Sequence, residues 1–319
     1  MQRGGNVHRR GVVAGILSLV LVLWAGAGAA FAQPILPVPD SFLAGVPLEL
    51  DNPGGSAPGS NDWSCLPSDA HPEPVVLLHG TGGAQQSNWA VYAPLLANEG
   101  YCVYALTYGN FPDQPWPMNA IGGMKPIDVG TAQVSAFVDR VLASTGASKV
   151  DIVGHSQGTM HANNYVKFFG GADKVGKIVS LAPLWQGTYG TEQVSIGKSM
   201  RSLGIDDEVQ AGIPACEACM QLLHGSAFID RMRSDGIYVP GIDYTNITTR
   251  YDEIVVPYTS GIEPGPNATN IVVQDGCEQD FSDHVSVAGS ARAAGFVLNA
   301  LDPDHPREVP CRFVAPVAG

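Results

Sequence analysis

The sequence has few basic residues, and after residue 32 it has no hydrophobic run long enough to cross a membrane. Lys and Arg together number 17 against 30 Asp and Glu, so the formal net charge is −13 at pH 7. Because the chain shows no basic patch, it is a poor candidate for binding nucleic acid or anionic membranes. Because no second long apolar run follows the first, we expect no membrane-spanning segment in the body of the protein.

The one long apolar run lies at the N-terminus. Three arginines and no acidic residue precede it, it extends from Val12 to about Ala30, and an Ala-x-Ala sequence ends at Ala32. This order is typical of a secretory signal peptide, and an uncleaved membrane anchor is the alternative. We predict a signal peptide over residues 1–32 and an extracellular mature protein. Its net charge moves from −13 to −16, because three arginines and no acidic residue are removed.

The cysteines are few but even in number. In an exported chain, six cysteines favour disulfides over metal sites, with fifteen possible pairings. Cys216-x-x-Cys219 with His224 nearby offers zinc as an alternative, but no second ligand pair accompanies it. We therefore predict no metal and assign all six to disulfides: Cys65, Cys102, Cys216, Cys219, Cys277 and Cys311.

Beyond the signal peptide, the chain divides into a short arm and a long domain. Residues 33–70 are rich in Pro, Gly, Ser and Asp, which predicts an extended N-terminal arm. Residues 71–319 alternate short apolar runs with helical patterns, which predicts one α/β domain. Residues 186–243 interrupt this alternation, and we interpret them as a cap or lid insertion.

The apolar runs predict the strands of the sheet. Near-continuous apolar runs suit buried parallel strands, and helices between them imply a mostly parallel sheet with helices on both faces. The predicted strands are residues 74–79, 101–107, 149–153, 177–182, 244–249 and 270–274. The predicted helices are a segment around 134–146, then 157–169, 219–232 within the cap, and 285–301.

One serine lies between two glycines where a predicted strand meets a predicted helix. The string Gly-His-Ser-Gln-Gly at 154–158 is weak evidence alone, because a Gly-Ser turn is the structural alternative. Its position between strand and helix is typical of a nucleophile elbow, in which a strained turn exposes the serine. We therefore predict that Ser156 is a catalytic nucleophile.

A serine nucleophile needs a histidine base and an orienting carboxylate, and on such folds the chain order is Ser, acid, His. His284 and His305 lie far enough downstream, and we choose His284 because His305 sits in a polar, proline-flanked tail. For the acid we choose Asp252, which follows a predicted strand. The acidic residues that we rank lower are its neighbour Glu253, Asp243 before that strand, and Asp275, Asp280 and Asp283, which we expect to be surface charges.

An oxyanion hole needs two backbone donors, one after the nucleophile and one after an early strand. Gln157 is the first, and Thr81 in LLHGTGG is the second, with its N–H and its hydroxyl both available. Apolar contacts to a substrate must come from loops over the site. We select Trp116 in the loop 109–123 and Trp185 at the start of the cap, with ordinary core packing as the alternative for each.

Five segments resemble one family of enzymes. They are NDWSC…HPEPVVLLHGTGG, VDIVGHSQGTM, LAPLWQGT, TTRYDEIVVPY and QDGCEQDFSDH, and together they span roughly residues 61–311. They resemble the secreted bacterial lipases of class 2 and, more distantly, lipase B of the yeast Candida antarctica. The resemblance implies an α/β-hydrolase fold and hydrolysis of esters with apolar acyl chains without a cofactor. It also implies a triad of Ser156, Asp252 and His284, with Thr81 and Gln157 as the oxyanion hole.

The resemblance also implies a disulfide pattern. It pairs Cys65 with Cys102 and Cys277 with Cys311, which leaves Cys216 with Cys219. The sequence departs from the family at two places. Thr159 stands where many relatives have glycine, and Trp185-Gln186 stands where relatives often have Asn-His. Both departures bear on the pocket, so the acyl-chain preference is left open.

The sequence thus predicts a secreted serine hydrolase, a triacylglycerol lipase that works through an acyl-enzyme. The alternatives are a short-chain carboxylesterase, a polyester hydrolase with the same triad, and a catalytically silent binding protein on a hydrolase fold. We expect a small or lipid ester as the partner, with action at a lipid–water interface. We expect no nucleic acid, no stable membrane insertion after signal cleavage, and a monomer.

Overall fold

The computed structural model describes residues 35–189 and 216–317. The predicted signal peptide and residues 190–215 of the predicted cap lie outside the described residues. Among the helices of the described ranges, none is long and apolar enough to cross a membrane.

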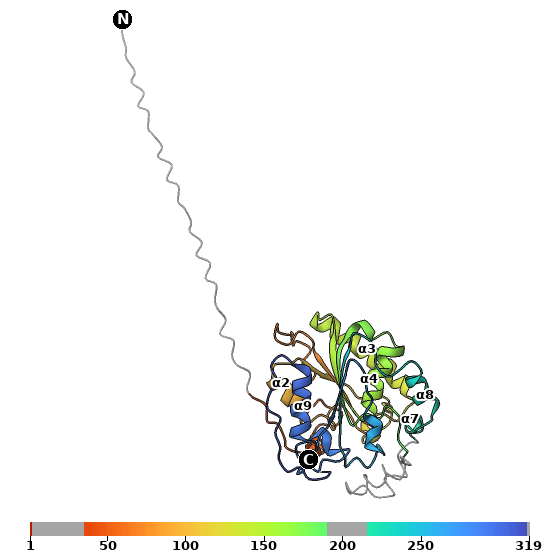
Figure 1. Ribbon diagram of the computed structural model, residues 1–319. Coiled ribbons are helices and arrows are strands. Elements are labelled where there is room, and N and C mark those ends of the chain that lie inside the picture. Colours follow the sequence, from red (N-terminus) through yellow and green to blue (C-terminus); the bar gives the residue numbers. More distant parts are fainter. Residues whose placement is uncertain (2–34, 190–215, 318–319) are drawn as a thin grey trace. The chain divides into compact units, whose positions relative to one another are not determined.

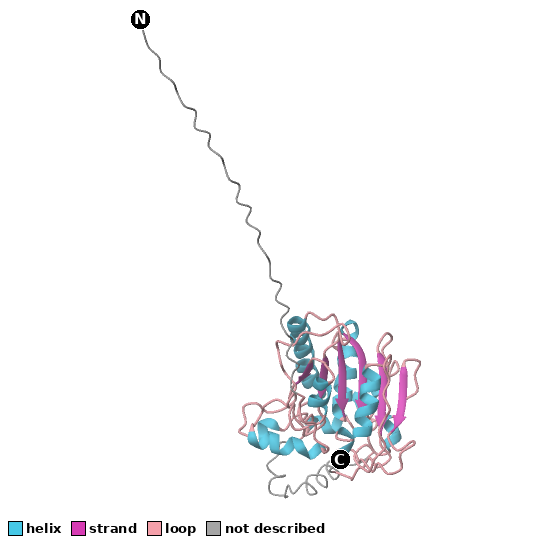
Figure 2. Ribbon diagram, turned by 90° about the vertical axis from the view of Figure 1, so that its left-hand side faces the viewer, coloured by secondary structure: helices cyan, strands magenta, loops and turns pink. Residues whose placement is uncertain are grey.

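A parallel sheet of six strands forms the centre of the fold, in the order β2-β1-β3-β4-β5-β6. Every neighbouring pair is parallel, and Figure 2 shows the strands running side by side. The strands are Val75–Leu78 (β1), Val103–Ala105 (β2), Val150–His155 (β3), Val175–Leu181 (β4), Asp243–Thr248 (β5) and Ala268–Val272 (β6). All six predicted strands are therefore confirmed to within a few residues, and so is the parallel sheet.

Helices cover both faces of the sheet, as predicted. Figure 1 shows α2 (Tyr92–Asn98) and α9 (Ala291–Leu301) on one side, and α3 (Ile127–Thr145) and α4 (Gln157–Phe168) on the other. Alternate residues of each strand enter two different hydrophobic clusters, and all four residues of β1 are fully buried. Burial on both faces explains why β1 and β2 are continuously apolar, whereas β6 is partly exposed and contains Thr269 and Asn270.

Two predicted helices are broken in the structure. The segment 285–301 consists of a 3-10 turn at Ser286–Ala288 and helix α9, which begins after Ser290. The Ser290 hydroxyl accepts a hydrogen bond from the Ala293 N–H and so caps the new helix. The segment 219–232 likewise forms two helices, α7 (Glu217–Gln221) and α8 (Ala227–Arg233), because Ser226 caps the second one.

The arm at 33–70 is not extended throughout, which corrects the prediction. It contains a 3-10 turn at Phe42–Ala44 and helix α1 (Gly45–Asp51). Further 3-10 turns lie at Met118–Ala120, Ala172–Lys174 and Tyr258–Gly261.

A disulfide between Cys65 and Cys102 ties the end of the arm to the start of β2. Two more disulfides join Cys216 to Cys219 and Cys277 to Cys311, so the pattern implied by the resemblance is present.

The described part of the predicted cap packs over the first turns of α3 and α4. Its helices α7 and α8 bury apolar side chains against Ile127 and Met160. Arg231 of α8 also forms an ion pair with Asp128 of α3, with 2.7 Å between Nη2 and Oδ1. The boundaries of the cap at 186 and 243 stay a prediction.

Candidate active site

The predicted site residues come from loops at one edge of the sheet. Strands β1, β3 and β5 all run toward this edge, where they are followed by Thr81, Ser156 and Asp252 respectively. His284 lies farther along the chain after β6. Parallel strands place their carboxyl ends together, so residues that are distant in sequence meet here.

Ser156 occupies the turn between β3 and α4, with φ 53° and ψ −123°. A non-glycine residue rarely adopts a positive φ, and such a conformation is strained. The two flanking glycines allow the turn. A Cβ on Gly158 would lie 2.0 Å from the Leu78 carbonyl oxygen, and one on Gly154 would lie 2.8 Å from the Thr159 nitrogen. The glycines thus permit close contact between strands and helix, as the elbow prediction requires.

The side chains of Ser156, His284 and Asp252 form one continuous hydrogen-bonded row. The Ser156 Oγ lies 2.8 Å from His284 Nε2. On the other side of the ring, Nδ1 lies 2.9 Å from each of the two carboxylate oxygens of Asp252. Ser156 and His284 are both buried. These three residues are the ones chosen from the sequence, and the structure brings them together.

The loop after β5 explains why Asp252 and not its neighbour reaches the histidine ring. Asp252 Oδ1 accepts hydrogen bonds from the N–H groups of Ile254 and Val255, at 3.1 and 2.7 Å. Glu253 instead accepts the backbone N–H of His284 at 3.2 Å. Asp252 therefore orients the imidazole, and Glu253 holds the backbone of the same residue.

The surroundings of His284 raise the pKa of its imidazole above the ordinary value. Burial alone lowers this pKa, but the negative charge of Asp252 and its hydrogen bond to Nδ1 outweigh the effect of burial. Glu253 and Asp283 add to the increase. The site therefore favours the protonated imidazole more than water does, which is the state that a base reaches after it accepts a proton.

The other candidate acids and the second histidine lie elsewhere. Asp275 is an exposed partner of Arg250, as expected of a surface charge. Asp280 and Asp283 are buried, which corrects the expectation that they are surface charges. Asp243 begins β5 at the opposite edge of the sheet, and His305 pairs with Asp302 on the exposed tail.

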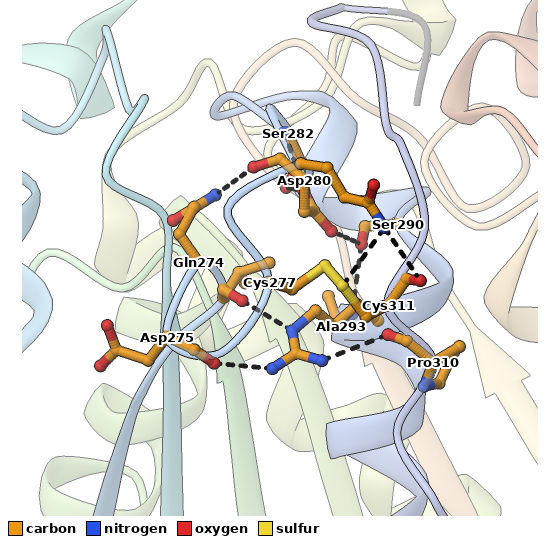
Figure 3. The surroundings of a disulfide bond; sticks show 12 residues. Gln274, Asp275, Cys277, Asp280, Ser282, Ser290, Ala293, Pro310 and Cys311 are labelled. Carbon is orange, nitrogen blue, oxygen red and sulfur yellow. Dashed lines mark hydrogen bonds between the residues drawn. A yellow bond between two sulfur atoms is a disulfide. The ribbon is translucent and has the colours of Figure 1, made fainter.

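Buried carboxylates and a disulfide brace the loop that carries His284. Asp280 accepts hydrogen bonds from Ser282 and from the Ser290 hydroxyl, and Figure 3 shows them beside the Cys277–Cys311 disulfide. Gln274 donates a hydrogen bond to the Asp280 carbonyl, at 3.1 Å. The loop is thus held from both sides, and the position of His284 does not depend on the triad contacts alone.

Two backbone N–H groups of the predicted oxyanion hole lack a protein acceptor within the described residues. Within residues 35–189 and 216–317, the N–H groups of Thr81 and Gln157 donate to no protein acceptor. Gln157 is also the first residue of α4, whose positive dipole end lies at this point. The two N–H groups are therefore available to an anionic oxygen, as expected of an oxyanion hole.

The two tryptophans differ in placement. Trp116 is 42% exposed in the loop 109–123. Trp185 is fully buried in the cluster beneath α7 and α8, and its indole N–H donates to Asn246 at 3.1 Å. Trp185 therefore has the core-packing role that was its alternative, because a fully buried side chain presents no surface to a substrate.

His155 and His161 are buried beside the site and were not identified from the sequence. His155 donates from Nε2 to the carbonyl oxygen of His284, at 2.8 Å. His161 lies 3.1 Å from the Gln157 amide nitrogen. For His161 the sequence holds a signal, because Gln157 and His161 are four positions apart and therefore lie on the same face of the helix. For His155 we find none, because its partner lies 129 positions away.

The sequence of this chain is similar to the sequences of known proteins. A family described as "Lipase (class 2)" matches residues 72–294. Triacylglycerol lipases of Pseudarthrobacter phenanthrenivorans and Burkholderia plantarii are each 34% identical over 90 residues, or 27% of this chain. The matched region covers only 25% and 22% of the length of those relatives.

Solved structures support the fold. Aspergillus fumigatus lipase B aligns with a TM-score of 0.58 and 18% identity, covering 80% of this chain and 56% of that protein. A Bacillus licheniformis lipase in its mature form aligns with a TM-score of 0.52 and 15% identity, covering 78% of this chain and 96% of that protein. At these identities the likeness concerns the fold alone, which is an α/β-hydrolase fold.

Proposed function

The chain belongs to the class 2 lipase family, and from this premise we propose that it is a secreted serine hydrolase of carboxylic esters with apolar acyl chains, a triacylglycerol lipase. The observation that carries the proposal is the unbroken row from Ser156 through His284 to Asp252, beside two backbone N–H groups that have no protein acceptor in the described part of the chain. A nucleophile, a base, an orienting carboxylate and an oxyanion site are the parts that acyl transfer requires.

Acylation begins when the Ser156 Oγ attacks the ester carbonyl carbon. His284 Nε2 accepts the hydroxyl proton, and Asp252 stabilises the resulting imidazolium through Nδ1. The backbone N–H groups of Thr81 and Gln157 bind the developing oxyanion. The tetrahedral intermediate then collapses, the bond to the alcohol oxygen breaks, and His284 returns the proton to the departing alcohol.

Deacylation repeats these roles with water. His284 accepts a proton from a water molecule that attacks the acyl carbon of the acyl-enzyme. The second tetrahedral intermediate releases the carboxylic acid, and Ser156 regains its proton from His284. No step needs a metal or a cofactor, because the protein groups supply both the nucleophile and the charge stabilisation.

Export of the protein is supported by two independent features. The N-terminal sequence has the order of a signal peptide. In addition, all six cysteines form disulfides, which persist in oxidising compartments. We propose the mature protein as a monomer that meets its ester at a lipid–water interface, with Trp116 as a contact for the acyl chain.

Initial rates on p-nitrophenyl esters from acetate to palmitate test the proposal, with Ser156→Ala as the blank. We expect Ser156→Ala to lose on the order of 10⁴-fold or more in kcat while folding normally. Rates that hold or rise toward long chains support a lipase, whereas a steep fall beyond butyrate supports a short-chain esterase or polyester hydrolase. Activity retained in Ser156→Ala would exclude the triad, and no rate above the blank on any ester would favour a silent binding protein.

A further inference from the structure

A row of buried and partly buried hydrogen bonds leads from the predicted oxyanion hole to the cap. The Thr81 hydroxyl lies 2.5 Å from Gln157 Oε1, and Gln157 Nε2 lies 3.1 Å from His161 Nε2. On the far side of the ring, His161 Nδ1 lies 3.0 Å from the Thr131 hydroxyl oxygen. Asn164 continues the row, 2.8 Å from the same hydroxyl. The acyl-transfer mechanism above uses none of these side chains.

The contacts at the cap end of the row determine which group donates in each of its hydrogen bonds. Asn164 donates from Nδ2 to a carboxylate oxygen of Asp128 at 3.0 Å, because a carboxylate only accepts. Its Oδ1 accepts from Arg231 of α8 at 3.1 Å, so the amide of Asn164 has one orientation. The second hydrogen on Nδ2 therefore points at Thr131.

The direction at Thr131 then determines the tautomer of His161. The Thr131 hydroxyl donates its one hydrogen to the Ile127 carbonyl, at 2.9 Å. With that hydrogen committed, Thr131 only accepts from Asn164 and from His161. His161 must therefore carry its proton on Nδ1 and accept on Nε2 from the amide nitrogen of Gln157.

The orientation of the Gln157 amide in turn determines the acceptor to which the Thr81 hydroxyl donates. With its amide nitrogen directed at His161, Gln157 presents its carbonyl oxygen to Thr81, whose hydroxyl donates to it. The Thr81 hydroxyl is then unavailable to the substrate oxyanion, and Thr81 keeps only its backbone N–H for that task. The sequence analysis offered both the N–H and the hydroxyl of Thr81 to the oxyanion, and the proposed row leaves only the N–H.

The row is enclosed tightly by glycine backbone. A Cβ on Gly123 would lie 2.9 Å from Gln157 Oε1, and one on Gly130 would lie 2.6 Å from His161 Cε1. His161 is 1% exposed, and burial lowers the pKa of its imidazole to about 3. The ring therefore stays neutral at ordinary pH, so the direction of the row does not change with pH.

We propose that Gln157, through its side chain, and His161 are positioning residues that hold Thr81 in place for oxyanion binding, in a row oriented from the cap by Arg231. The proposal rests on the proposed function, because the oxyanion belongs to that reaction. The side chains of Gln157 and His161 do not touch the reacting atoms; they act by fixing the loop whose N–H does.

The first test compares kcat and KM for p-nitrophenyl butyrate in Gln157→Ala and Thr81→Val. Gln157→Ala keeps its backbone donor, so any loss reports the side chain alone. We expect kcat to fall about 10-fold in each with KM within about twofold, less than the 10²–10³-fold cost of deleting an oxyanion donor. Thr81→Ser keeps the hydroxyl and should stay within about threefold of the natural protein. The double variant Thr81→Val with Gln157→Ala should lose no more than either alone, because both act on one donor.

A matched control separates positioning from folding. Asn163 is equally buried on α4, donates to the Ile237 carbonyl at 2.9 Å, and lies outside the row. Asn163→Ala should lower Tm while leaving kcat unchanged, whereas Gln157→Ala lowers kcat. An unchanged kcat in both Gln157→Ala and Thr81→Val, or additive losses in the double variant, would overturn the proposal.

A second measurement does not depend on activity. Nitrogen-15 NMR of the His161 ring should show a neutral imidazole protonated on Nδ1 between pH 5 and 9. Arg231→Ala removes one of the two side-chain contacts that orient the amide of Asn164, so it should weaken this preference while the contact with Asp128 remains. A ring protonated on Nε2 in the natural protein would overturn the proposed direction. If the protein hydrolyses no ester, the proposed function fails, and the NMR result still decides the row on its own.

Discussion

His284 and His161 are both buried, yet their surroundings move the pKa of each imidazole in opposite directions. His284 faces the carboxylate of Asp252, with Glu253 and Asp283 nearby, and its pKa is raised. His161 lies among the uncharged groups of Gln157 and Thr131, and burial lowers its pKa to about 3. Burial alone thus does not decide the charge of a histidine; its hydrogen-bond partners do.

The two regions are also braced differently. The loop of His284 is anchored by the Cys277–Cys311 disulfide and by the buried carboxylates of Asp280 and Asp283. The loop of Thr81 is held by hydrogen bonds, including reciprocal backbone bonds of Gly82 and Gly83 with Gly122. The loop of the proposed base is thus held by a covalent bond, and the loop of the proposed oxyanion donor is held by hydrogen bonds between uncharged groups.

Removing the negative charge beside His284 should have the largest effect on activity. We expect Asp252→Asn to lower kcat on the order of 10⁴-fold, because the amide neither stabilises the imidazolium nor holds the right tautomer. Rates on p-nitrophenyl butyrate check this, with Asp243→Asn, an exposed change at the opposite edge of the sheet, as the control. A loss of less than 10-fold in Asp252→Asn would contradict the role of Asp252.

The pH profile of kcat/KM should report the charge of His284 and not that of His161. His284 acts as a base only when neutral, so activity should rise with pH through its pKa, by about 10-fold per unit below that pKa. Since the pKa of His284 is raised, the midpoint of the rise should lie above 6.5. His161, with a pKa of about 3, should add no limb at neutral pH. A midpoint at or below 6.5 would show that Asp252 does not outweigh burial.

The smallest expected effect is the difference between two disulfides in how much each stabilises the protein. Cys277 and Cys311 are 34 positions apart, and Cys216 and Cys219 are 3 apart. The chain-entropy relation predicts a loss of about 3–4 kcal/mol in the free energy of unfolding for the Cys277/Cys311 pair replaced by serine, and about 2 kcal/mol for the other. Urea unfolding measures both, and equal losses would indicate that native-state strain or packing outweighs the loop length.

Much of the fold follows from local patterns in the sequence. Apolar runs identified β1 and β2 because these strands are buried along their whole length, and β6 was found although Thr269 and Asn270 in it are exposed. Gly154 and Gly158 marked the elbow because a short strand-to-helix turn leaves no room for their side chains. The breaks before α8 and α9 were missed, because apolar spacing continues through Ser226 and Ser290 while their hydroxyls start new helices.

By itself, then, the sequence determined the parallel sheet, the elbow at Ser156 and the chain order in which the proposed acid and the proposed base follow it. Only the tertiary structure decided that Asp252 reaches the ring while Glu253 holds the backbone of His284. It also decided that Trp185 lies in the core and that His161 adjoins Gln157 and Thr131. The reason is distance along the chain, because strand burial and turn geometry depend on residues that are close together in the sequence. Hydrogen-bond partners such as Ser156 and His284, 128 positions apart, meet only when the whole sheet is packed.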